Sequence, residues 1–224
     1  MGGGFLKIRL RTLIIAWVAV IAALLYLTFA DAAIKPKLTG GTSYTKSMSL
    51  WQLQRFKTVT LMRREPMRWC PFKAYLAFDR YIRIGMADNR YFMSVDADVE
   101  SLLASDAAYN KRFATDFPTS GSRNEQIQQI YDYCAATKYV AHVNTAREVF
   151  TTRKGDCAGI SAAFYVLCKA KNIPVRYVIG WTKEGMHAWN RVRMKDGWYW
   201  IDCTRGIWLL TKKQYSGRTV MEYW

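Results

Sequence analysis

The chain has no Cys-x-x-Cys pair and contains only two histidines among its 224 residues. Structural zinc sites are usually built from closely spaced pairs of such ligands, so the sequence gives no indication of one. The five cysteines are an odd number, which leaves at least one thiol unpaired in any set of disulfides. A dense disulfide scaffold is therefore excluded, although a single bridge, such as one between Cys70 and Cys134, stays open.

Acidic residues are also scarce, with 17 Asp and Glu against 33 Lys and Arg and a formal net charge of +16. A charge of this sign and size favours anionic surroundings. The basic residues are scattered and form no motif that reads RNA or DNA, so we expect no nucleic-acid partner. An anionic cell-surface polymer or an anionic lipid is the expected partner.

The N-terminus combines basic residues with a long uncharged segment. Lys7, Arg9 and Arg11 precede an uncharged run of 18 residues, 13–30. This pattern is typical of a signal peptide, but the run is longer than usual and approaches the roughly 20 residues of a membrane span. Residues 1–33 are therefore expected to be a signal peptide or an N-terminal membrane anchor. Either one predicts a secreted or membrane-anchored protein whose catalytic domain is extracellular.

Composition then divides the rest of the chain. Residues 34–47 are polar and rich in Gly and Ser, which predicts a linker. Residues 48–120 show mixed signals, with short strands expected at 57–62 and 81–84 and a helix over 96–117. We interpret 48–120 as an N-terminal extension of unknown role.

Breaker residues at Pro118 to Ser122 mark the start of a second region, which we expect to be a separate domain over 121–224. Ser and Thr followed three residues later by Glu form capping boxes, which predict helices starting at 123 and 146. A third helix is expected from Cys157 to about Lys171, because Asn172 favours a left-handed cap.

Three strands are expected after these helices, over 175–182, 187–194 and 198–204. The last two flank an Asp-Gly pair, which is typical of a hairpin. Helices followed by an antiparallel sheet predict an α+β fold in which the third helix packs on the sheet.

Cys157 stands at the predicted start of that helix. The free N–H groups and the dipole of a helix N-terminus favour a thiolate, so Cys157 is a candidate nucleophile. The alternative is a packing role, because free cysteine is among the most buried residue types. We assign that role to Cys168, three turns further along the same helix, and to Cys203.

His187 and Asp202 supply the groups that such a nucleophile needs. If Lys195 and Asp196 form the hairpin tip, Asp202 lies opposite Trp189 and diagonal to His187, on the same face of the sheet. A tip of three residues would place His187 and Asp202 on opposite faces. In the first register Asp202 accepts the Nδ1–H of His187, which directs Nε2 toward Cys157.

The motifs around these residues resemble the transglutaminase-like superfamily of cysteine enzymes. They are Gly-Asp-Cys at a helix start, "LCKAKNIP" at its end, "HAWNRV", and "WYWIDCT", all within residues 123–206. The resemblance implies a papain-like α+β core in which Cys157 attacks an acyl carbon, His187 transfers the proton and Asp202 orients His187. It also implies a peptide or protein amide as substrate, no metal and no organic cofactor.

Two departures limit what the resemblance implies. Cys203 stands where a proline often follows the aspartate, and the chain lacks the accessory domains and calcium dependence of animal cross-linking enzymes, so animal-type cross-linking is not expected. We expect an exported cysteine peptidase or acyltransferase that acts on peptide or isopeptide bonds of cell-wall or surface proteins through a thioester acyl-enzyme. The alternative is a catalytically idle module for adhesion or cell-wall binding. The backbone N–H of Cys157 is the expected oxyanion donor, and Tyr139 and Trp181 are candidates for the second.

Overall fold

The computed structural model describes residues 41–45, 49–55, 61, 64–87, 90–211 and 219–223. The predicted leader at 1–33 and most of the strand predicted at 57–62 lie outside these ranges. Within the ranges, no helix combines the length and the apolar character needed to cross a membrane.

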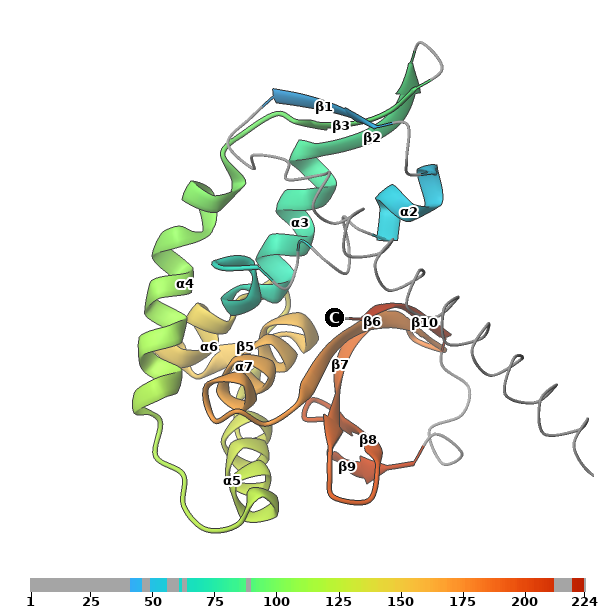
Figure 1. Cartoon of the computed structure of the whole chain (residues 1–224). Helices are drawn as coiled ribbons and strands as arrows, with labels where there is room; N and C mark the ends of the chain where they lie inside the picture. The colour runs from blue at the N-terminus through green and yellow to red at the C-terminus, as the bar shows by residue number, and fades with distance from the viewer. Residues whose placement is uncertain are drawn as a thin grey trace, which may run out of the picture.

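A central helix and a five-stranded antiparallel sheet form the C-terminal half of the molecule (Figure 1). Helix α7, Cys157–Ala170, packs against β6 and β7. The strand order is β10-β6-β7-β8-β9, with bounds Val175–Thr182 (β6), Gly185–Arg193 (β7), Trp198–Asp202 (β8), Ile207–Leu210 (β9) and Thr219–Tyr223 (β10). The predicted α+β arrangement is confirmed.

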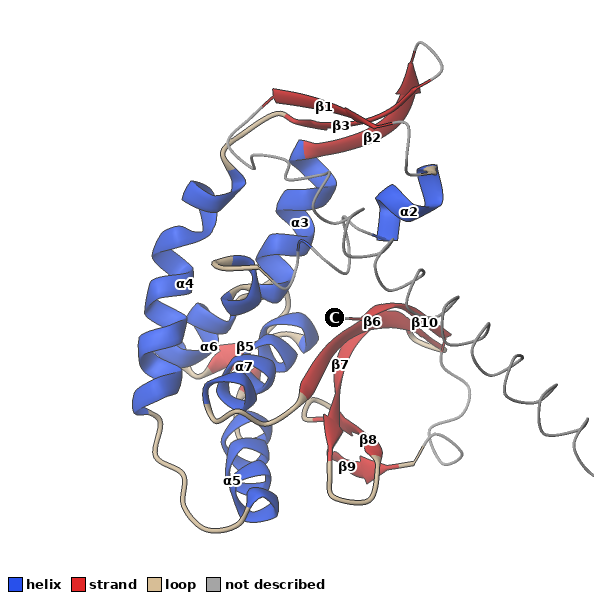
Figure 2. Ribbon diagram, viewed as in Figure 1, coloured by secondary structure: helices blue, strands red, loops and turns tan. Residues whose placement is uncertain are grey.

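Helices surround α7 on the side away from the sheet, as the colouring by secondary structure shows (Figure 2). They are α4, Val99–Asp116, α5, Arg123–Ala135, and α6, Ala146–Thr152. Both predicted capping boxes are present, at Ser122 with Glu125 and at Thr145 with Glu148. Past the end of α7, Asn172 has the predicted left-handed conformation, with φ of 54°.

A smaller antiparallel sheet in the order β1-β3-β2 lies at the N-terminal end of the described chain (Figure 1). Its strands are Gly41–Thr45 (β1), Ile82–Ala87 (β2) and Arg90–Val95 (β3), and α2, Leu50–Arg55, η3, Met67–Trp69, and α3, Pro71–Tyr81, belong to the same region. A linker was predicted over residues 34–47, but strand β1 lies inside this range, so the prediction is wrong for residues 41–45. The sequence of this edge strand is polar, and its backbone pairing with β3 is a tertiary contact that composition does not reveal.

The buried core does not divide near residue 120, where a domain boundary was expected. One cluster of buried apolar side chains extends from Leu53 to Cys203. A polar contact crosses the same boundary, since Asp106 on α4 accepts from Arg147 Nη1 at 2.9 Å, besides accepting from Lys73 Nζ at 2.8 Å on its own side. The segment 64–120 therefore packs on the C-terminal half as part of one core, rather than as a separate extension.

All five cysteines are free thiols, so the bridge between Cys70 and Cys134 that the sequence left open is not formed. Cys157 is partly exposed and the other four are buried. Burial raises the pKa of the Cys70 thiol to about 12, and it also raises the pKa of Cys168 and of Cys203. The packing role predicted for Cys168 and Cys203 agrees with this burial.

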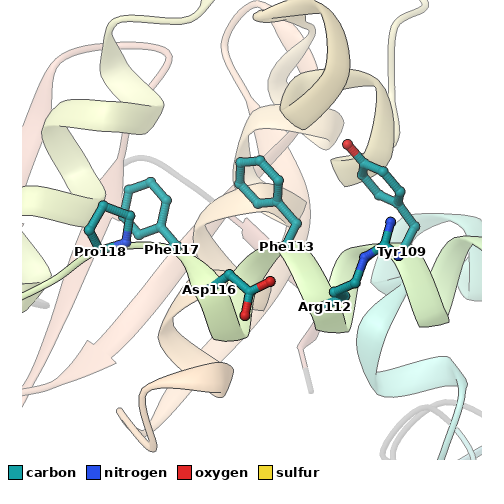
Figure 3. Close-up of a pocket in the computed structure, with 6 residues that line it drawn as sticks. All are labelled: Tyr109, Arg112, Phe113, Asp116, Phe117 and Pro118. Atoms are coloured by element: carbon teal, nitrogen blue, oxygen red, sulfur yellow. The ribbon is translucent and has the colours of Figure 1, made fainter.

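A shallow hollow of about 260 Å³ lies at the C-terminal end of α4, and Figure 3 shows its lining. None of the three candidate catalytic residues lines it. The lining residues are Tyr109, Arg112, Phe113, Asp116, Phe117 and Pro118.

Candidate active site

The start of α7 is fixed by its cap and by a close backbone approach. Asp156 is the N-cap, and its Oδ1 accepts the backbone N–H of Gly159 at 3.0 Å. The backbone N–H of Asp156 donates to Val143 O at 2.7 Å. A Cβ at Gly159 would lie only 2.6 Å from Val143 O, so this contact requires glycine. Cys157 is consequently held as the first residue of the helix, beside the segment that includes Val143.

The hairpin of β7 and β8 has the register predicted for a two-residue tip. Met194 N donates to Gly197 O at 2.8 Å, and Asn190 pairs with Ile201. The same register places Asp202 opposite Trp189 and therefore on the face of His187. The sequence-based placement of His187 and Asp202 on one face is confirmed.

His187 joins the other two candidate residues. Its Nε2 lies 2.8 Å from Asp202 Oδ2, and the Cys157 side chain is close enough to the ring to affect its pKa. Burial opposes protonation of the imidazole, but the hydrogen bonds and charges of Asp202 and Cys157 outweigh it and raise the pKa of His187 to about 9. The imidazolium form is thus favoured across the neutral pH range.

The ring orientation differs from the one expected, which had Nδ1 on Asp202 and Nε2 on Cys157. In the structure Nε2 bonds to Asp202, so Nδ1 is the nitrogen left for Cys157. The diagonal pairing explains the difference, because residues related in this way are separated by roughly 7–8 Å. Nε2, the nitrogen farther from the backbone, bridges this gap more readily than Nδ1.

Asp202 is completely buried and both of its oxygens have partners. Oδ1 accepts from Thr204 Oγ1 at 2.6 Å and from Thr204 N at 3.2 Å, while Oδ2 faces His187. Burial raises the pKa of the carboxyl. This effect is outweighed by the hydrogen bonds from His187 and Thr204 and by the positive charges of His187 and Arg205, so the net shift of the pKa is downward. Asp202 therefore stays ionised beside His187.

Three polar side chains that the sequence analysis did not single out hold α7 against the sheet. Ser161 Oγ donates to Ala188 O at 3.0 Å, and Asn190 Nδ2 donates to Ser161 O at 3.1 Å. Tyr177 Oη donates to Ala158 O at 3.2 Å. Only Asn190 carried a sequence signal, as the Asn of the "HAWNRV" motif.

The aromatic residues singled out in the sequence analysis differ in burial. Trp189 is fully buried and its ring stacks on His187 with centroids 5.8 Å apart. Tyr139 and Trp181 are 58% and 51% exposed, so both lie at the surface rather than in the core. His142, the other histidine, is also exposed.

Metal ligation finds no support among these contacts. Within the part of the chain that the structure describes, no three His, Cys, Asp or Glu side chains are grouped closely enough to hold a metal ion.

The family comparison bears directly on this geometry. The model of the transglutaminase-like superfamily matches residues 107–203, a range that ends directly after Asp202. Residues 107–203 form a transglutaminase-like domain. The resemblance drawn from the sequence is confirmed, and the match begins within α4, ahead of the domain start expected at residue 121.

Two solved structures are similar to the chain at low identity. One is a candidate cysteine protease from Cytophaga hutchinsonii, with 14% identity, a TM-score of 0.41, and coverage of 63% of this chain and 65% of that one. The other is a TGase, with 16% identity, a TM-score of 0.34, and coverage of 60% and 47%. The chain spans less than two thirds of either structure, and likeness at this level carries no functional argument. No curated protein matches the chain.

Proposed function

We propose that the protein is a cysteine hydrolase or acyltransferase that acts on peptide or isopeptide amides through Cys157, His187 and Asp202. The observation that carries the proposal is the position of His187, which bonds to buried Asp202 through Nε2 and lies close to partly exposed Cys157. Transglutaminase-like proteins are generally cysteine-based enzymes, and this arrangement supplies a nucleophile, a base and an orienting carboxylate.

The chemistry follows from the three side chains. The Cys157 thiolate adds to the carbonyl carbon, and the oxygen takes the electron pair of the broken π bond. We assign the backbone N–H of Cys157, at the start of α7, as a donor to this oxyanion. When the oxyanion collapses, the C–N bond breaks, the leaving amine takes the proton from His187 Nδ1, and a thioester remains on Cys157.

The second half of the reaction returns the enzyme to its starting state. Water or a second amine adds to the thioester carbonyl and gives a proton to His187 Nδ1. The C–S bond then breaks and releases the acid or the new amide, with Cys157 again a thiolate. Asp202 keeps the ring in place throughout through its bond to Nε2.

We also propose that the protein is exported and that its substrates are cell-wall or surface proteins. The basic residues ahead of the uncharged run 13–30 support export, and the net charge of +16 favours an anionic cell surface.

Acylation by p-nitrophenyl acetate tests the reaction without knowledge of the natural substrate. We expect stoichiometric release of nitrophenolate and an acetyl group on Cys157, located by peptide mass spectrometry. Hydroxylamine should remove this group, because it cleaves thioesters. The Cys157→Ala variant should show no burst, while Cys168→Ala, which changes a buried thiol of the same helix, should keep it. Acetylation spread over lysines, or equal in Cys157→Ala, would support the idle binding module instead.

A further inference from the structure

Arg205 links the candidate triad to the exposed end of the β6–β7 hairpin. Its Nη2 donates to Glu184 Oε2 at 2.9 Å and to Thr182 Oγ1 at 3.2 Å, and its Nε lies 3.9 Å from Asp202 Oδ2. Thr182 Oγ1 in turn donates to Glu184 Oε2 at 2.8 Å. The guanidinium therefore lies between an exposed carboxylate, Glu184, and the buried carboxylate of Asp202.

The two carboxylates do not share Arg205 equally. Glu184 is bonded to it directly, whereas Asp202 is beyond hydrogen-bond distance. The oxygen nearest to Arg205, Asp202 Oδ2, is also the oxygen that holds His187 Nε2. A guanidinium bonded to this oxygen would compete with His187 for it, and its charge would disfavour a protonated imidazole.

We propose that Glu184 and Arg205 are positioning residues that set the charge state of His187. Arg205 helps to keep Asp202 ionised, and Glu184 holds Arg205 far enough away that His187 keeps its bond to Oδ2. Charges then alternate from the surface to the nucleophile, from Glu184 through Arg205, Asp202 and His187 to Cys157. The inference deepens the proposed function, because the charge on His187 matters to the reaction only if Cys157 is the nucleophile.

Other titratable groups lie near His187 and Asp202, and Arg205 differs from them in its charge. Cys157 and Asp156 approach from the start of α7, and Tyr139 lies near both of them and near Arg205. Tyr131 of α5 lies near Asp202. Of these neighbouring groups, all within the described part of the chain, Arg205 alone is positively charged at neutral pH. Its removal and its approach toward Asp202 should therefore change the electrostatics of His187 in opposite directions.

The test is an NMR titration of the histidine rings, in a Cys157→Ala background that removes the thiol from the titration. The chain has two histidines, so exposed His142 serves as an internal reference. We expect Arg205→Ala to raise the midpoint of the His187 titration by about half a pH unit or more, because a nearby positive charge is removed. Glu184→Gln should lower it by a similar amount, because Arg205 is released toward Asp202.

The double variant Glu184→Gln with Arg205→Ala should titrate like Arg205→Ala alone, since Glu184 acts through Arg205. Arg205→Gln, which removes the charge but keeps a long polar side chain, serves if Arg205→Ala does not fold, and exposed Glu184 is expected to tolerate its change. Shifts of the same sign in both single variants, or no shift in either, would overturn the inference. The thiol is absent in this experiment, so these results are independent of whether Cys157 reacts with acyl donors.

Discussion

Replacement of His187 by alanine is expected to slow acylation of Cys157 by about 10²- to 10⁴-fold near neutral pH, the range typical of a lost general acid–base. In amide cleavage His187 supplies the proton that the leaving amine takes. With p-nitrophenyl acetate, whose nitrophenolate leaves without a proton, the loss is expected because the charge of His187 no longer stabilises the thiolate before attack. Its ring is 8% exposed and bonded to Asp202, and water that enters the space left by the ring is a far weaker acid and base than imidazole. The measurement is the burst rate with p-nitrophenyl acetate under pseudo-first-order conditions.

His142→Ala is the matched control, because His142 is the other histidine and is exposed. Its burst rate should stay within about twofold of the wild type, and both variants should unfold at similar urea concentrations. A His187→Ala variant that is folded and acylates at the wild-type rate would show that the ring takes no part in the reaction.

The second large effect is expected on stability, from Gly159→Ala. Alanine is normally the better helix former, by about 0.5–1 kcal/mol. At this position, however, the new Cβ would meet Val143 O at 2.6 Å and the backbone of Asn144 at 3.2 Å. Backbone atoms cannot move away from the new Cβ as a flexible side chain could. The cost of overpacking should therefore exceed the gain in helix propensity and lower the free energy of unfolding by about 1–3 kcal/mol. Acylation should also slow, because Cys157 lies half a turn earlier on α7.

Urea unfolding of Gly159→Ala and Gly197→Ala checks this expectation. Gly197 is the control because a Cβ there has its nearest neighbour, a ring atom of Tyr199, at 3.9 Å, an ordinary contact. Its stability should change by less than about 0.5 kcal/mol. Gly159→Ala with wild-type or greater stability would show that the approach of Val143 to α7 is not tight.

Local sequence signals were sufficient to predict the elements that position the site. The two capping boxes and Asn172 fix helix ends through contacts made within a few residues, and these are readable from spacing. The Asp-Gly pair located the hairpin, and a two-residue tip at Lys195 and Asp196 gave the register that places His187 and Asp202 on a shared face.

The features that the sequence did not reveal depend on contacts between distant segments. Strand β1 exists because it pairs with β3, and the expected boundary near residue 120 disappears because α4 packs on α7. The contacts of Arg205 with Glu184 and Thr182 join residues more than twenty positions apart. The ring orientation of His187 was missed because both orientations satisfy the same pattern, and only the diagonal distance to Asp202 favours Nε2.

The central claim is that a protonated His187 maintains a reactive Cys157 thiolate. The most direct test is the rate of Cys157 alkylation by iodoacetamide from about pH 5 to about pH 9, read by peptide mass spectrometry in the wild type and in His187→Ala. Because His187 keeps its proton up to a pKa of about 9, its positive charge lies beside Cys157 over most of this range, and alkylation at about pH 6 is predicted to be much faster in the wild type than in His187→Ala. Slow alkylation of the wild type at about pH 6, or equal rates in the two proteins, would contradict the claim and leave Cys157 as a packing residue at the start of α7.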